Sequence, residues 1–195
     1  MEHFYQSFKS ARPDYKPMQS MFSFPKLYSQ AIKRCRPKGT VVEIGTWVGQ
    51  SFAYLAVEAI NSKKNINIVG IDTFTGLLPG WQKKGISSPQ WNIFKKNLDP
   101  VWDEIIAIRA DSSKVAWMFK DVDFVFIDGD HSYKGVMKDL EAWWPTMNDK
   151  GIFAGHDITS KNPYNGVKKA VDEFTQKLGL TYYTQERCWI IDKAV

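Results

Sequence analysis

The segment FVFIDGDHSY, residues 124–133, decides the fold. Its first four residues are apolar and indicate a buried strand, which Asp128 ends. Beyond the turn that follows, apolar residues recur at helical spacing from Tyr133 until Pro145 stops the helix. A buried strand that leads through a short turn into an amphipathic helix is one unit of an α/β protein with a parallel sheet.

The same alternation of strands and helices continues on both sides of this segment. Helical patterns begin near residues 25, 51, 89, 133 and 167. Strands are predicted at residues 40–44, 66–72, 104–108, 123–127, 151–155, 180–184 and 188–192. Only residues 185–187 separate the last two strands, which is too little chain for a parallel crossover, so these strands should form an antiparallel hairpin. The predicted fold class is α/β, a Rossmann-like three-layer sandwich whose seven-stranded sheet is mostly parallel and ends in that hairpin.

The length and composition indicate one globular domain. A chain of 195 residues, 44% of them hydrophobic, can bury one substantial core. Residues 1–37 are predicted to form an N-terminal extension with one helix that begins at Pro25, and residues 38–195 the Rossmann-like domain. Residues 75–102 connect two strands and contain several glycines, prolines and tryptophans, and the length of this connection suggests a lid.

The charge and cysteine content argue against several classes of protein. The 26 basic and 21 acidic residues give a net charge of +5, but they are scattered, so a solvated surface is favoured over a nucleic-acid interface. Cys35 and Cys188 are too few for a disulfide framework and lack the spacing of a zinc site. The apolar runs are too short to cross a membrane and no signal-peptide pattern is present, so we expect a cytoplasmic protein. These features are compatible with a homo-oligomer.

The loop after the first predicted strand has the form of a ligand-binding turn. In VVEIGTWVGQS, residues 41–51, Glu43 lies near the end of the strand, and Gly45 and Gly49 allow a tight turn and the close approach of a ligand. The helix that follows directs its N-terminus at this loop. Trp47 occupies the place of the middle glycine of the dinucleotide fingerprint, which disfavours an NAD-linked oxidoreductase.

Acidic residues also follow the next two strands. Asp72 could accept hydrogen bonds from both hydroxyls of an adenosine ribose, and Asp111 with Ser112 could contact the adenine. Asp111 is equally suited to cap a helix. Because ligands bind at the carboxyl ends of strands in open α/β sheets, a nucleoside site is favoured here. The predicted cofactor-binding residues are Glu43, Gly45, Thr46, Gly49, Ser51, Asp72, Thr73, Asp111, Ser112 and Asp128.

The fourth and fifth strands end in residues suited to catalysis. Asp128, His156 and Asp157 should converge at neighbouring strand ends, where they could hold one divalent cation as its predicted ligands. His131 and Asp128 are the predicted catalytic residues, with His131 as a general base because the pKa of a histidine lies near neutrality. His156 has a structural alternative, because it is also suited to a hydrogen-bonded place in the core. Asp130, which lies between Asp128 and His131, is suited to cap the following helix.

The strand ends together resemble one known family. The series EIGTWVG (43–49), IDTF (71–74), ADS (110–112), FIDGDHSY (126–133) and GIFAGHDI (151–158) is similar to the class I S-adenosylmethionine-dependent methyltransferases, specifically to the methyltransferase domain 24 family. Its relatives include metal-dependent O-methyltransferases of macrolide sugars and, more distantly, catechol O-methyltransferase.

This resemblance implies that a methyl group passes from S-adenosylmethionine to a hydroxyl of a small molecule or sugar. It also implies that Asp128 and Asp157 are Mg²⁺ ligands and that His131 is the base. The chain departs from the pattern at His156, which stands where catechol-type relatives have a metal-binding carboxylate. Two alternatives remain open, a cofactor-binding Rossmann protein without methyl transfer and an NAD-linked oxidoreductase.

Overall fold

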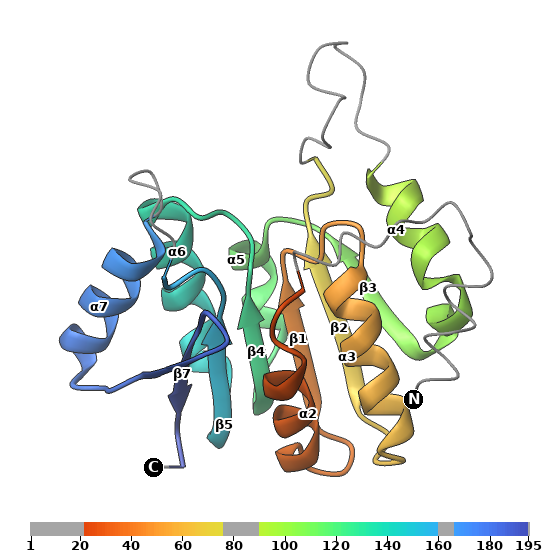
Figure 1. The fold of residues 1–195 in the computed structure, drawn as a ribbon, viewed down its shortest axis with the longest axis horizontal. Helices are drawn as coiled ribbons and strands as arrows, with labels where there is room; N and C mark the ends of the chain where they lie inside the picture. The colour runs from red at the N-terminus through yellow and green to blue at the C-terminus, as the bar shows by residue number, and fades with distance from the viewer. Residues whose placement is uncertain (1–21, 76–89, 160–165, 195) are drawn as a thin grey trace.

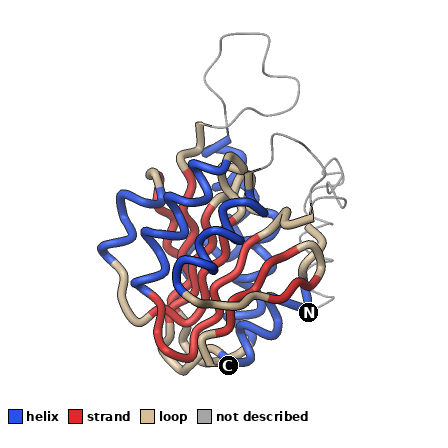
Figure 2. Tube along the Cα trace, turned by 90° about the vertical axis from the view of Figure 1, so that its left-hand side faces the viewer, coloured by secondary structure: helices blue, strands red, loops and turns tan. Residues whose placement is uncertain are grey.

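The computed structural model describes residues 22–75, 90–159 and 166–194. Within these residues, a sheet of seven strands lies between two layers of helices (Figures 1 and 2). The strands are β1 (Thr40–Ile44), β2 (Asn67–Asp72), β3 (Ile105–Arg109), β4 (Val122–Ile127), β5 (Met147–Gly155), β6 (Tyr183–Gln185) and β7 (Cys188–Asp192). The α-helices are α2 (Pro25–Arg34), α3 (Gln50–Asn61), α4 (Gln90–Leu98), α5 (Ser112–Val115), α6 (Tyr133–Trp143) and α7 (Val167–Leu178), and the 3-10 helices are η1 (Asp99–Glu104), η2 (Ala116–Met118) and η3 (Trp144–Thr146). In this part of the chain, no helix is long and apolar enough to span a membrane.

The strands are arranged in the order β3-β2-β1-β4-β5-β7-β6. β1 pairs in parallel with β2 on one side and with β4 on the other, and β3 and β5 continue the parallel sheet outward. β7 is antiparallel both to β5 and to β6. The predicted fold is therefore confirmed, including the final hairpin. The strand order reverses between β1 and β4, and at such a switch point open α/β sheets bind their ligands.

The final hairpin turn is shorter than the sequence predicted. β6 spans Tyr183–Gln185 rather than residues 180–184, so Glu186 and Arg187 alone form the turn. Their φ angles of 51° and 65° are typical of a type I′ turn, which matches the twist of the flanking strands. The residues before β6 complete the end of α7, where Gly179 is the left-handed C-cap at φ 64°.

Two hydrophobic layers hold the helices on the sheet. On one face, α2, α3 and α4 pack through buried side chains such as Leu27, Phe52 and Phe94. On the other face, α6 and α7 pack through Trp143 and Phe174. Every residue of β4 is buried, and its side chains enter both layers. The end of β4, where Asp128 lies, is thus held by packing on both faces of the sheet.

The structure describes only parts of the predicted N-terminal extension and of the predicted lid. Residues 1–21 of the predicted extension lie outside the described residues, whereas α2 is part of the same core as the sheet. Residues 76–89 of the predicted lid also lie outside the described residues. The rest of that connection forms α4 and η1, where Trp91 and Trp102 pack against the core.

Candidate active site

A cavity of about 880 Å³ opens at the carboxyl ends of the parallel strands. Most of the predicted site residues line it, namely Gly45, Thr46, Ser51, Asp72, Thr73, Asp111, Ser112, Asp128, His131, His156 and Asp157. Glu43 and Gly49 lie outside this lining and support it from behind. The cavity is also lined by residues that the sequence did not single out, among them Phe22, Phe24, Lys138, Asp139 and Arg187.

The loop between β1 and α3 requires its two glycines. Gly45 has a φ of 86°, and a side chain there would place its Cβ atom 2.2 Å from the carbonyl oxygen of Asp128. Gly49 has a φ of 89° and is the N-cap of α3, and a Cβ atom there would meet Leu98 at 2.2 Å. Because both positions combine a left-handed backbone with a close neighbour, other residues would distort the loop. The glycines thus keep the β1 loop next to the end of β4.

Glu43 lies behind this loop, where its carboxyl group is fully buried. The hydroxyl of Tyr28 donates to one carboxyl oxygen at 2.7 Å, and the hydroxyl of Ser51 donates to the other at 2.6 Å. Burial raises the pKa of Glu43 to about 8 in spite of these hydrogen bonds. Glu43 therefore links α2 and α3 to β1 from beneath the cavity.

Replacing Glu43 by glutamine should change how the free energy of unfolding depends on pH. A carboxyl group with a pKa of about 8 when folded and near 4.5 when unfolded binds more protons in the folded state, so its contribution to stability is lost as the pH rises through this range. Glutamine does not titrate. The unfolding free energy of the wild type should therefore fall by about 3–4 kcal/mol relative to Glu43→Gln between pH 5 and pH 8. Urea denaturation at both pH values measures this difference, and parallel pH dependences of the two proteins would contradict it.

Asp72 ends β2, lines the cavity and accepts hydrogen bonds from neighbouring residues. The backbone N–H of Trp47 donates to Oδ2 at 2.8 Å, and that of Phe74 donates to Oδ1 at 2.7 Å. Burial raises the pKa of Asp72, and the hydrogen bonds oppose this effect. The side chain of Gln90 and the backbone of Thr73 also hydrogen-bond to this carboxylate, which lines the cavity.

Asp111 caps a helix, as the sequence allowed, and also lines the cavity. It is the N-cap of α5, where it accepts hydrogen bonds from the backbone and hydroxyl of Ser113, and it lines the cavity. The ammonium group of Lys138 donates to Asp111 at 2.6 Å and lowers the pKa of its carboxyl group. Beside it, the hydroxyl of Ser112 donates to Asp139, whose pKa burial raises to about 6. This end of the cavity is therefore lined by polar groups from both α5 and α6.

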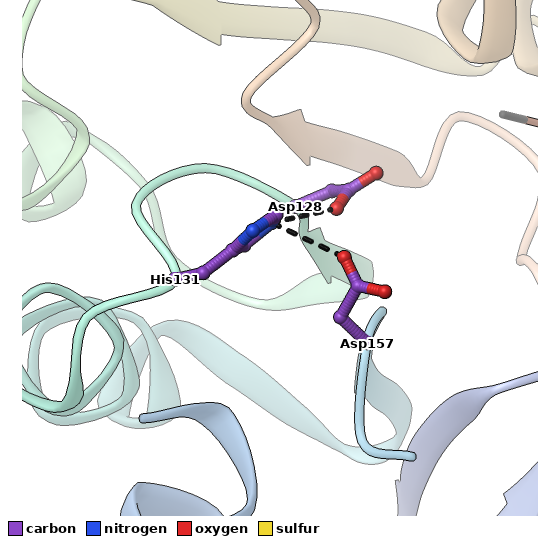
Figure 3. A group of neighbouring side chains, drawn as sticks. All are labelled: Asp128, His131 and Asp157. Carbon is purple, nitrogen blue, oxygen red and sulfur yellow. Dashed lines mark hydrogen bonds and ion pairs between the residues drawn. The ribbon is translucent and has the colours of Figure 1, made fainter. Parts of the chain in front are cut away.

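Four side chains meet where β4 and β5 end (Figure 3 shows Asp128, His131 and Asp157). Nε2 of His131 lies 3.4 Å from Oδ1 of Asp128 and 3.5 Å from Oδ2 of Asp157. Nδ1 of His156 approaches the same two oxygen atoms, at 3.7 Å and 3.5 Å. Among the described residues, Asp128, His131 and Asp157 form a group whose potential ligand atoms all lie within 4.8 Å of one another. The predicted convergence of these strand ends is thus present in the structure, with His131 inside the cluster.

Hydrogen bonds and ion pairs shift the pKa values of two groups in this cluster. The hydrogen bond with Asp128 raises the pKa of His131, because a carboxylate favours the protonated ring. Hydrogen bonding from His156 lowers the pKa of Asp157, and the guanidinium group of Arg187 donates to Oδ1 of Asp157 at 2.6 Å.

The expectation that Asp130 caps α6 needs a correction. Ser132 is the N-cap, and Asp130, which lies two residues before it, accepts hydrogen bonds from the backbone and hydroxyl of Ser132 instead of capping the helix itself.

His156 fits both interpretations that the sequence left open. Its side chain is only 7% exposed, and its ring packs 4.9 Å from the ring of Phe24. Nε2 lies 3.3 Å from the hydroxyl of Ser23, and Nδ1 faces the carboxylates. His156 is therefore a hydrogen-bonded core residue on one side and a member of the polar cluster on the other.

The site residues that sequence reasoning missed come from segments distant along the chain. Phe22, Ser23 and Phe24 precede α2, and Arg187 lies in the turn between β6 and β7. An expectation that the last hairpin packs beside β5 could have pointed to Arg187, because a short turn at the strand ends faces the cavity. No pattern within residues 22–24 marks them as part of a site.

A family profile and a sequence relative match this chain. The profile of the methyltransferase domain 24 family, described as a methyltransferase domain, matches residues 42–158, which is more than half of the chain. An uncharacterized protein of Acanthamoeba polyphaga mimivirus is 29% identical over 158 residues, which cover 78% of this chain and 66% of the viral protein. The chain thus spans slightly less than two thirds of that relative.

Solved structures share the fold. The O-methyltransferase NovP superimposes with a TM-score of 0.68 at 15% identity, over 86% of this chain and 78% of NovP. The SAH-bound methyltransferase PaMTH1 of Podospora anserina gives a TM-score of 0.61 at 16% identity, over 96% of this chain and 86% of PaMTH1. At these identities the likeness shows the fold, and the match of residues 42–158 shows the family. The chain belongs to the methyltransferase domain 24 family of class I S-adenosylmethionine-dependent methyltransferases.

Proposed function

We propose that this protein transfers a methyl group from S-adenosylmethionine to a hydroxyl group of a small molecule or sugar in the cytoplasm. One observation carries the proposal: His131, flanked by two carboxylates, lines the same cavity as Asp72 and the glycine loop. A group that can take a proton and groups that can hold a nucleoside thus share one space. Such a combination suits group transfer to a bound hydroxyl.

The proposed cofactor site runs along the ends of β1, β2 and β3. S-adenosylmethionine supplies a methyl group on a positively charged sulfur atom. Asp72 would accept hydrogen bonds from the ribose hydroxyls, because its carboxylate ends β2 and lines the cavity beside the glycine loop. Asp111 and Ser112 lie at the next strand end, where an adenine would follow the ribose. The proposed contacts further include Gly45, Thr46, Ser51, Thr73 and Asp128, with Glu43 and Gly49 supporting the loop.

His131 would take the proton of the acceptor hydroxyl at Nε2. Oδ1 of Asp128 and Oδ2 of Asp157 lie 3.4 Å and 3.5 Å from this atom, so the positive charge that forms on the ring is stabilised there. In-line methyl transfer needs alignment of the acceptor and removal of its proton. The rigid ends of β4 and β5 would provide the alignment, and His131 the deprotonation.

The residues at this end of the cavity also fit a divalent cation. Asp128, His131 and Asp157 offer potential ligand atoms within 4.8 Å of one another, and Nδ1 of His156 lies 3.7 Å and 3.5 Å from carboxylate oxygens of Asp128 and Asp157. Asp128, His156 and Asp157 would hold the ion, and Mg²⁺ is the ion that the family resemblance implies. When bound, a divalent cation lowers the pKa of a nearby hydroxyl and so assists its deprotonation.

Removal of divalent cations with a chelator should reduce turnover by about 10-fold or more, because the assistance to deprotonation would be lost. The measurement compares initial rates after chelation and after the ion is added back. Full activity of the chelated protein would contradict a catalytic metal and leave His131 as a base acting alone.

The function itself is tested by incubating the protein with S-adenosylmethionine and a panel of hydroxyl compounds, with detection of S-adenosylhomocysteine and the methylated product. We expect at least one of the sugars or aromatic alcohols in the panel to be methylated. Binding of S-adenosylmethionine without methylation of any acceptor would favour the alternative of a cofactor-binding protein without methyl transfer.

A further inference from the structure

We propose that the metal site of this chain selects a transition ion such as Mn²⁺, Co²⁺ or Zn²⁺ over Mg²⁺, because His156 places a nitrogen ligand beside Asp128 and Asp157. We further propose that Ser23 is the positioning residue that orients His156 for this role. The inference rests on the proposed function for the location of the site and adds the chemical class of its ion.

The spacing of the potential ligand atoms supports a compact mixed site. Nδ1 of His156 lies 3.7 Å from Oδ1 of Asp128 and 3.5 Å from Oδ2 of Asp157. Tetrahedral sites with metal–ligand bonds of about 2.0–2.2 Å separate their ligand atoms by about 3.3–3.6 Å. The two distances from Nδ1 of His156 to the carboxylate oxygens are therefore close to those that one small ion would require.

The ring of His156 is held in the orientation that a ligand needs. Its side chain is 7% exposed, and Phe24 packs against it with ring centroids 4.9 Å apart. A histidine that binds a metal through Nδ1 carries its proton on Nε2, and an acceptor for that proton fixes the ring. The hydroxyl of Ser23, 3.3 Å from Nε2, is in place to accept it.

Two neighbouring residues, Arg187 and His131, differ from the proposed ligands in their contacts and exposure. Arg187 donates to Oδ1 of Asp157, the oxygen that does not face the histidines, so Oδ2 stays directed at the cluster. His131 differs from His156 in burial, with a side chain that is 46% exposed and lies on the turn before α6. The buried ring of His156 suits a fixed ligand, whereas the accessible ring of His131 suits a base.

The ligand set determines which ion is preferred. Mg²⁺ is bound by oxygen ligands and water, whereas imidazole suits the transition ions. A carboxylate at position 156 would complete an all-oxygen set. With histidine there, one protein ligand is a nitrogen atom, and affinity shifts toward the transition series.

The test is a calorimetric titration of the metal-stripped full chain with MgCl₂, MnCl₂ and CoCl₂. In the wild type, Co²⁺ should bind about 100-fold more tightly than Mg²⁺. The His156→Glu variant should show a preference for Co²⁺ that is about 10-fold smaller, because all three of its proposed protein ligands are oxygen atoms. The visible absorption of bound Co²⁺ should change between the two proteins. An unchanged preference in His156→Glu, or Mg²⁺ binding as tight as Co²⁺ binding in the wild type, would overturn the proposal.

Ser23 provides a second, independent variant. Ser23→Ala should weaken Co²⁺ binding by about 10–100-fold, as expected when the partner of a metal-binding histidine is lost, and Ser23→Thr should restore it. His3→Ala is the control for nonspecific binding of the ion by a histidine outside the proposed site. This variant should bind Co²⁺ with the same affinity as the wild type. Equal Co²⁺ affinity and absorption in Ser23→Ala would refute the positioning role.

A separate titration with S-adenosylmethionine distinguishes failure of this inference from failure of the proposed function. Loss of ion selectivity with cofactor binding intact concerns the metal inference alone. Absence of cofactor binding would instead contradict the proposed function.

Discussion

Replacement of His131 by alanine should lower turnover by about 10²–10⁴-fold, the range that a general base contributes. Nε2 of His131 lies between Oδ1 of Asp128 and Oδ2 of Asp157, where a proton taken from an acceptor hydroxyl would be stabilised. Alanine removes the proton acceptor and leaves both carboxylates in place. The affinity for S-adenosylmethionine should remain nearly unchanged, because the residues proposed to hold the ribose and adenine lie on other strand ends.

The measurement combines single-turnover rates with calorimetric titration of the cofactor. Lys134→Ala is a matched control, because Lys134 is an exposed residue on the first turn of α6, the helix that follows His131, and does not line the cavity. His131→Gln keeps a polar side chain of similar size and should be as slow as the alanine variant. Turnover within threefold of the wild type in His131→Ala would eliminate His131 as the base.

Replacement of Asp72 by alanine should weaken the binding of S-adenosylmethionine by about 100-fold. A hydrogen bond to a charged acceptor contributes about 1.5–3 kcal/mol, and the carboxylate of Asp72 lines the cavity where the ribose is proposed to bind. The same carboxylate also accepts the N–H groups of Trp47 and Phe74, so its loss should loosen the β1 loop as well. Both effects act in the same direction on cofactor affinity.

Two comparisons separate these effects. Asp72→Asn keeps one oxygen acceptor and should bind the cofactor with intermediate affinity, whereas Asp99→Ala removes an exposed carboxylate outside the cavity and should bind like the wild type. Thermal unfolding of each variant without cofactor reports on the loop. Equal affinity of Asp72→Ala and the wild type would show that the ribose is held elsewhere.

The parts of the site that could be predicted from the sequence lie at strand ends. The apolar runs of β1, β2 and β4 are buried in the structure, and the residues that follow each run are therefore placed by the sheet itself. Asp72 and Asp128 were accessible to prediction because parallel strands end at the same edge of a sheet.

The parts that could not be predicted depend on contacts between distant segments. Ser23 meets His156 across 133 residues, and Arg187 meets Asp157 only because β7 pairs with β5. Asp139 lies within the helical pattern of α6, and only the packed structure shows that Ser112 is its partner. Such contacts are fixed by tertiary packing, which local periodicity does not describe.

The central claim is that the cavity at the ends of β1, β2 and β4 binds S-adenosylmethionine, and calorimetric titration of the purified chain tests it most directly. S-adenosylmethionine and S-adenosylhomocysteine should each bind at one molecule per chain, with binding weakened in Asp72→Ala, and NAD should not bind. Binding of NAD without binding of S-adenosylmethionine would contradict the account.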